Sequence, residues 1–147
     1  MTFRLTPIGR DGQLAPDVQR PPSDVLEICR ATKDHHDRVG FHPPWIGYLA
    51  LEGGEVVGGG GFVGPPEGGR VEIAYFTRPE RQSQGYATRT AAALIAIARE
   101  AEPGLAIWAK TLPEPGPSPS VLARLGFVRD GVAIDHEIGE AWAWLLP

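Results

Sequence analysis

The 147-residue sequence predicts an α/β fold built on a mixed, mostly antiparallel sheet of about seven strands. Three observations support this prediction. Alternating apolar residues indicate a strand over 71–77, and the pattern of an amphipathic helix follows over 85–101. An apolar segment at 105–110 completes a strand–helix–strand unit, whose two strands are expected to be parallel. The other strand patterns are joined by short turns, which is typical of antiparallel hairpins.

Composition limits the class of protein. The length is that of one domain, expected to span 1–147, with an ordinary hydrophobic content of 42%. A net charge of −4 argues against a nucleic-acid partner, which would require a basic face. The apolar runs are too short to span a membrane, and Cys29 has no second cysteine to pair with. We therefore expect a cytoplasmic protein without a membrane partner.

The N-terminal part predicts a strand, a loop and a helix. Residues 3–8 alternate as a strand does, and 9–22 have the composition of a loop. Ser23 is expected to cap a helix over about 23–38, with Asp24 near its positive end. The predicted buried stripe of this helix consists of Val25, Leu26, Cys29 and Ala31.

A hairpin is predicted next. Strands over 45–51 and 56–63 are expected to pair across a turn at 52–55. The second strand contains four consecutive glycines, 58–61. No helix follows to supply a dipole for a phosphate, so we interpret the run as a strand with a large group packed closely over it. That group is either a core aromatic side chain or the substrate.

The C-terminal part predicts one short helix and two strands. A proline-rich loop over 111–117 precedes the helix, which Ser118 is expected to cap and Gly126 to end. The last two strands are predicted over 127–133 and 141–146.

The connection between the central strand and the long helix is the candidate binding site. Pro79 ends the strand because it has no N–H group to give to a neighbour. Gly85 and Ala87 then lie where the first turn of the helix forms. The first N–H groups of a helix lack internal partners, and the macrodipole makes that end partly positive. A loop of small residues at this position can therefore bind an anion such as a pyrophosphate.

The motif Gln82-x-x-Gly85-x-Ala87 resembles the acetyl-CoA pyrophosphate loop of the GNAT superfamily of N-acetyltransferases. The run E-I-A-Y-F-T-R-P-E-R-Q-S-Q-G-Y-A-T is similar to the branch that acetylates ribosomal-protein N-termini, although Ser83 stands where that branch usually has Gly. The resemblance implies a twisted sheet with helices on both faces and acetyl-CoA as the co-substrate. It also implies a small-molecule amine or a protein N-terminus as acceptor, and it allows a homodimer.

In the resembling family, two strands separate in the middle of the sheet and the pantetheine arm lies between them. The resemblance assigns pantetheine contacts to the backbone of Phe76 and Thr77. It assigns diphosphate contacts to Gln82, Ser83, Gln84, Gly85, Tyr86, Ala87 and Thr88. The end of the chain, where Ser118 leads into a helix that ends in Gly-Phe, is similar to a late motif of the superfamily. Pro115 replaces the Asn of that motif, and Leu122 stands where many relatives have Tyr.

Glu72 and Ser118 are the candidate catalytic residues. Partial burial of Glu72 in an apolar strand is expected to raise its pKa, so that it could accept a proton through water. The alternative is a Glu paired with an Arg or facing solvent. Ser118 matches a serine that some members place near the CoA sulfur, where it would serve as the general acid. The alternative is a helix cap without a catalytic role.

Other polar groups suggest weaker hypotheses. His35, His36 and His42 have no zinc-like spacing, so we expect surface histidines and no metal. Trp142 and Trp144 share one face of the last strand as core or interface residues. The acidic turn over 135–140 either attracts a cationic amine or is a solvated hairpin tip.

The sequence thus predicts an acetyl-CoA-dependent N-acetyltransferase that transfers the acetyl group directly within a ternary complex. A covalent route through Cys29 is disfavoured, because this residue lies on the predicted apolar face of the first helix. The alternative function is a CoA-binding sensor or interaction module of the same fold that has lost catalysis.

Overall fold

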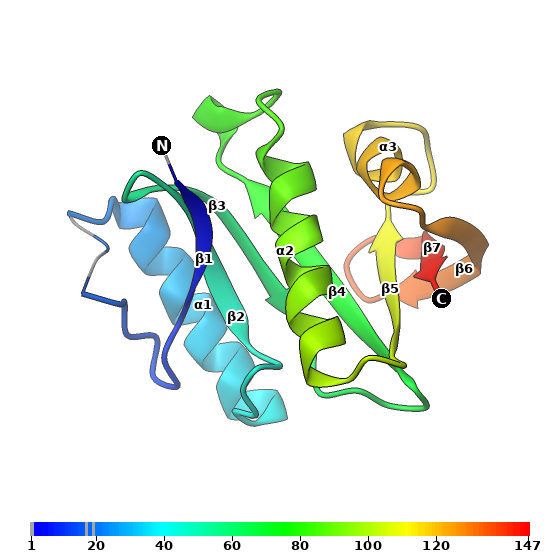
Figure 1. Cartoon of the computed structure of the whole chain (residues 1–147), viewed down its shortest axis with the longest axis horizontal. Coiled ribbons are helices and arrows are strands. Elements are labelled where there is room, and N and C mark those ends of the chain that lie inside the picture. The colour runs from blue at the N-terminus through cyan, green and yellow to red at the C-terminus, as the bar shows by residue number, and fades with distance from the viewer. Residues whose placement is uncertain (1, 17, 19) are drawn as a thin grey trace.

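The computed structural model describes residues 2–16, 18 and 20–147, and these form a seven-stranded sheet with helices on both faces (Figure 1). The strand order is β1-β2-β3-β4-β5-β7-β6. The strands are β1 (Phe3–Pro7), β2 (Gly47–Glu52), β3 (Glu55–Phe62), β4 (Arg70–Thr77), β5 (Ala106–Thr111), β6 (Val128–Asp135) and β7 (Gly139–Leu146). The helices are α1 (Ser23–Val39), α2 (Tyr86–Ala101) and α3 (Pro117–Arg124), with one 3₁₀ turn, η1 (Pro79–Arg81). The predicted fold class is confirmed.

Strands β4 and β5 form the one parallel pair among the described strands, as their connection through α2 predicts. Their register is short: Arg70, Val71 and Glu72 pair with 106–108. Beyond Glu72 the two strands diverge towards their C-terminal ends (Figure 1). The sheet is therefore split at its centre, and the second half of β4 has no strand partner on that side.

The two faces of the sheet have separate cores, because successive strand residues point to opposite faces. Leu49 packs with Val25 and Cys29 of α1, whereas its neighbour Ala50 packs with Tyr86 of α2. The larger core lies on the α2 side and includes residues from β4, β5 and α3. It also contains Trp144, which together with the partly buried Trp142 shares this face of β7, as predicted.

Helix α1 departs from the predicted buried stripe. Val25 and Cys29 are buried, but Leu26 is 45% exposed and Ala31 is also exposed. His36, which we expected at the surface, is 3% exposed and takes the next position of the stripe. Steps of three and four residues from Cys29 lead to this histidine. It is therefore buried because of its position in the helical period, although its side chain is polar.

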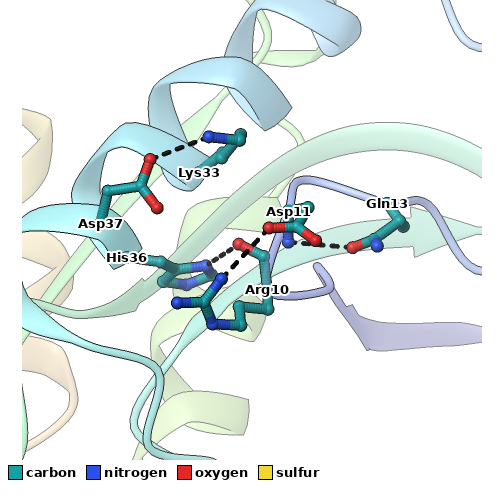
Figure 2. Close-up of polar contacts among 6 residues, drawn as sticks. All are labelled: Arg10, Asp11, Gln13, Lys33, His36 and Asp37. Atoms are coloured by element: carbon teal, nitrogen blue, oxygen red, sulfur yellow. Dashed lines mark hydrogen bonds and ion pairs between the residues drawn. The ribbon is translucent and has the colours of Figure 1, made fainter.

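Figure 2 shows how His36 is accommodated beneath the segment over 10–13. Its Nδ1 lies 3.3 Å from the carbonyl oxygen of Arg10 and therefore donates the hydrogen bond. The ring of Phe41 packs edge-on against it, with ring centroids 5.0 Å apart. This contact attaches the loop that precedes α1 to the helix. The predicted loop over 9–22 also includes residues 17 and 19, which lie outside the described residues.

Two predicted helix caps are wrong. Helix α1 has Pro22 at its cap position, so Ser23 is already the first helical residue. Helix α3 has Gly116 at its cap position, and Ser118 lies one residue inside the helix without a side-chain cap hydrogen bond. In both cases a proline lies next to the boundary, and its fixed φ suits the start of a helix. Gly126 ends α3 in a left-handed conformation with φ +97°, as predicted.

The four-glycine run lies within β3, and a side chain packs over it. A Cβ atom added to Gly59 would lie 2.9 Å from the ring of Phe76 on β4. A Cβ atom added to Gly61 would lie 2.7 Å from the carbonyl oxygen of Ile46. The run is therefore a strand at close approach, and the large neighbour of Gly59 is an aromatic side chain.

Candidate active site

The loop that precedes α2 has the backbone conformation expected of an anion site. Gly85 is the N-cap residue, with φ +84°, and Ser83 also has a positive φ of +63°. The first turn of α2 contains no acidic residue and receives no side-chain cap. The N–H groups at this helix end therefore remain available, and the helix dipole favours an anion there.

A cavity of about 630 Å³ connects this loop with β4 and α3. Its lining contains eight of the nine residues predicted to bind the cofactor: Phe76, Thr77, Gln82, Ser83, Gly85, Tyr86, Ala87 and Thr88. Gln84 is exposed and outside the lining. Tyr86 contributes backbone here, since its side chain is 9% exposed and its ring stacks on that of Phe3. The α3 side is formed by Pro117, Ser118, Ser120, Val121 and Arg124.

Tyr75 is a functional candidate that the sequence analysis missed. It lines this cavity, and its hydroxyl is buried without a hydrogen-bond partner of acceptable geometry. Burial raises the pKa of Tyr75 to about 12, and the nearby Ser118 side chain opposes this rise. The phenol therefore stays protonated and can donate a hydrogen bond. The Thr77 hydroxyl on the same face is also buried without a partner.

These two unpaired hydroxyls and the loop fit acetyl-CoA. Buried polar groups are normally hydrogen-bonded, so the Tyr75 and Thr77 hydroxyls at the wall of the cavity have capacity for a further hydrogen bond. The pantetheine arm carries amides that can pair with them and with the edge of β4, which has no strand partner beyond Glu72. Arg124 adds a cation at the wall of the cavity, suited to a phosphate, and the sequence analysis did not identify it.

Glu72 lies on the opposite face of β4, outside this cavity. Its side chain is 14% exposed, and its Oε2 lies 3.5 Å from Lys110 Nζ. Burial raises the pKa of Glu72 as predicted, Lys110 opposes this rise, and Asp135 adds to it. The ion-pair partner of Glu72 is therefore Lys110 of β5, whereas the sequence suggested an arginine. The structure does not bring Glu72 and Ser118 into one cavity, because they lie on opposite faces of the sheet.

The acidic turn is partly neutralised within the fold. Asp135 accepts hydrogen bonds from the N–H groups of Glu137 and Ile138 and lies 3.3 Å from Lys110 Nζ. The Glu137 hydrogen bond is the largest cause of its lowered pKa. Lys110 thus links a carboxylate of the hairpin tip to Glu72. Among the described residues, no group of three or more His, Cys, Asp and Glu side chains is arranged to hold a metal ion.

The chain belongs to the acetyltransferase (GNAT) domain family, whose model matches residues 14–128. This membership confirms the enzyme class, an acyltransferase that uses acetyl-CoA. Solved structures that are similar to this chain extend the comparison. The chain is similar to a ribosomal-protein-S5-alanine acetyltransferase from Vibrio fischeri, with 14% identity, 98% and 92% of the two chains covered and a TM-score of 0.71.

A second similar structure is a GNAT-family acetyltransferase from Desulfovibrio desulfuricans, with 18% identity, 99% and 97% of the two chains covered and a TM-score of 0.67. A third is Mycobacterium smegmatis RimJ in complex with CoA-disulfide, with 21% identity and a TM-score of 0.62. That match covers 84% of this chain and 61% of the RimJ chain. No curated protein matches the sequence. No helix in the described part of the chain has the length and apolar character needed to cross a bilayer.

Proposed function

We propose that the protein moves an acetyl group directly from acetyl-CoA to a primary amine within a ternary complex. The observation that carries this proposal is the open start of α2, where Gly85 and Ser83 have left-handed backbones beside the unpaired edge of β4. The diphosphate would bind the N–H groups of this loop. The pantetheine arm would lie along Phe76 and Thr77, which places the thioester at the split between β4 and β5.

Glu72 is the proposed general base. The carboxylate is positioned on the side of the sheet opposite the CoA cavity, so it can accept a proton from an amine that approaches from that side. Its raised pKa brings its basicity closer to the range suited to general-base catalysis. The contact with Lys110 supports its orientation.

Ser118, with Tyr75 beside it, is the proposed proton donor to the CoA sulfur. Ser118 lies in the CoA cavity and does not cap α3, so its hydroxyl is free of that structural role. Tyr75 is the second hydroxyl in the same place. In this scheme the amine nitrogen bonds to the acetyl carbon, the carbon–sulfur bond breaks, and the thiolate takes a proton from one of these hydroxyls. Cys29 takes no part, because burial raises its pKa and keeps it a thiol.

The acceptor is proposed to be a protein N-terminus or a small-molecule amine. The name of the Vibrio fischeri relative, a ribosomal-protein-S5-alanine acetyltransferase, supports the first of these. The homodimer stays a prediction. Release of free CoA thiol from acetyl-CoA in the presence of a panel of primary amines tests the transfer itself.

The second candidate function is a CoA-binding module without catalysis. Its supporting observation is Leu122, which is fully buried where many relatives have a tyrosine. Binding of acetyl-CoA without thiol release on any amine of a broad panel would favour this function over transfer.

Replacing Glu72 with Gln tests the proposed base. Turnover is expected to fall by roughly a hundredfold or more, with CoA affinity unchanged. In the wild type, activity should fall as the pH drops through the raised pKa of Glu72, and the variant should lack this acid limb. The raised pKa also means that protonation favours the folded state, so wild-type stability relative to Glu72→Gln should rise as the pH falls. Unchanged turnover would remove Glu72 from the mechanism.

A further inference from the structure

A second cavity, of about 360 Å³, lies between α1 and the sheet, on the face away from the CoA loop. Ile28, Ala31 and His35 of α1 form one wall, and Gly61 of β3 and Ala74 of β4 lie opposite them. Gly47, Gly60 and Gly61 contribute backbone without side chains to its lining. A Cβ atom on Gly61 would lie 2.7 Å from the carbonyl oxygen of Ile46 and 2.8 Å from the Cα of Gly47, so a larger residue does not fit there without a shift of the backbone.

The two cavities share Tyr75 and Phe76 as lining residues. They are therefore separated by the thickness of strand β4. The parallel pairing of β4 ends at Glu72, so beyond that residue the strand edge on the β5 side has no strand partner. Ala74 and Phe76, which line the second cavity, belong to this unpaired part of β4.

Apart from Tyr75, whose hydroxyl has no partner, the polar side chains that line this cavity, Thr32, His35 and Tyr48, already have partners within the protein. Thr32 Oγ1 donates to the carbonyl oxygen of Ile28 at 2.9 Å, and the Tyr48 hydroxyl donates to that of Pro44 at 2.8 Å. The ring of His35 lies with Nε2 2.8 Å from the carbonyl oxygen of Val63. A carbonyl only accepts, so Nε2 carries the proton.

The cavity also has no formal charge. His35 is its one titratable side chain besides the two tyrosines, and burial is the main cause that lowers its pKa. The ring is therefore neutral near pH 7. A polar or charged substituent placed here would lose its hydration with no unpaired side chain besides Tyr75 to bind it, whereas an apolar substituent would gain from leaving water.

We propose that the acceptor is a primary amine whose neighbouring substituent is apolar, such as a branched aliphatic chain or a single aromatic ring, and that the cavity between α1 and β4 binds this substituent. The proposal rests on the proposed acetyl transfer. The amine itself would lie at the free edge of β4, and the apolar group would contact Ala31 and Ala74. The volume is at the lower end of the range for ligand pockets, roughly 300–1,000 Å³, which suits a small substituent.

Leucinamide and asparaginamide test the proposal, because their side chains have similar size and shape but opposite polarity. We expect kcat/KM for leucinamide to exceed that for asparaginamide by roughly tenfold to a hundredfold, the value of burying one such apolar side chain. Ala31→Phe should remove this preference by filling the cavity. The control variant Arg30→Phe adds the same side chain at a position of α1 outside the cavity lining and should retain the preference. Residues 30 and 31 are exposed, so both variants are expected to fold with unchanged CoA affinity.

Equal or better use of asparaginamide would overturn the proposal and leave acetyl transfer intact. If no amine is turned over, acetyl transfer is overturned. The proposed role of the cavity would then be tested by ligand binding alone. In that case, NMR titration with leucinamide should show saturable binding to the wild type and to Arg30→Phe but not to Ala31→Phe. Absence of binding to the wild type would overturn the proposal.

Discussion

Helices α1 and α2 begin in different ways. In α1, the carboxylate of Asp24 lies in the first turn, and its two oxygens accept hydrogen bonds from Arg78 at 2.9 and 3.2 Å. In α2, no acidic residue lies in the first turn, and Gly85 turns the chain into the helix with φ +84°. The start of α1 thus has an anion of the protein itself, Asp24, which connects this helix to Arg78 directly after β4. The start of α2 is left for an anion from outside, which is the proposed CoA diphosphate.

The strongest test of this difference places an acidic residue in the first turn of α2, where α1 has Asp24. Ala87→Asp should weaken CoA binding by about a hundredfold or more, because like charges about 4 Å apart repel by roughly 4 kcal/mol at an effective dielectric constant of 20. The folded state should be as stable as the wild type, or slightly more so, since a carboxylate suits a helix start. Calorimetry and thermal melting measure the two effects. Ala87→Asn is the neutral control of equal size, and an equal loss in both variants would show that charge is not the cause.

A smaller effect is expected when the left-handed turn before α2 is strained. Gly85→Ala places a Cβ atom on a left-handed backbone, which costs about 1–2 kcal/mol, so a shift of the loop should raise the Kd for CoA by about tenfold. Gly54 in the β2–β3 turn is a matched control, with φ +89° and, like Gly85, no atom within 4 Å of an added Cβ. Gly54→Ala should cost similar stability and leave CoA affinity unchanged. A similar loss of affinity in both variants would contradict a specific role for Gly85.

At α1, the same comparison predicts an effect on stability and little on binding. Asp24→Asn removes the charged pair with Arg78, whose side chain is 13% exposed against 48% for Asp24. Because one partner is half-exposed, we expect a loss of about 1 kcal/mol in the free energy of unfolding and a CoA Kd within about twofold. Asp37→Asn breaks an exposed pair with Lys33 of 2.8 Å and should cost less stability than Asp24→Asn, because water screens both of its charges. Denaturant unfolding measures the loss of stability in each variant. Equal losses would show that the contact between Asp24 and Arg78 contributes no more than an exposed ion pair.

The smallest effect is expected at Ser83, where φ is +63°. Ser83→Gly should relieve about 1 kcal/mol of backbone strain, which the greater freedom of Gly in the unfolded chain largely offsets. The free energy of unfolding should therefore rise by less than about 1 kcal/mol, and CoA affinity should change by less than about twofold. A large loss of affinity, measured by calorimetry, would show that the serine side chain itself contacts the ligand.

The fold was predictable where local patterns decide structure. The period-two pattern of β4, the period of α2 and the glycine at position 85 are all visible in the sequence, and each follows from backbone geometry. The parallel pairing of β4 with β5 followed from the helix between them. Helix starts were predicted less well, because Ser23 and Ser118 have the composition of caps but prolines beside them fix the boundaries.

The contents of the site could be predicted only in part, because they depend on contacts between distant segments. Glu72 stood out as a carboxylate in an apolar strand, but its partner Lys110 comes from β5 and Asp135 from the last hairpin. Tyr75 has the pattern of an ordinary strand residue. The burial of its hydroxyl in the site depends on α3, which brings Ser118 next to β4 in the folded chain.

The central claim is that the amide groups at the start of α2 bind the CoA diphosphate, and amide NMR of the ¹⁵N-labelled protein tests it most directly. On titration with CoA, the resonances of residues 83–88 should shift together in a saturable way, while those of Asp24 and its neighbours in α1 stay in place. If CoA binds and the resonances of 83–88 do not move, or if CoA does not bind, the account of the α2 loop is contradicted.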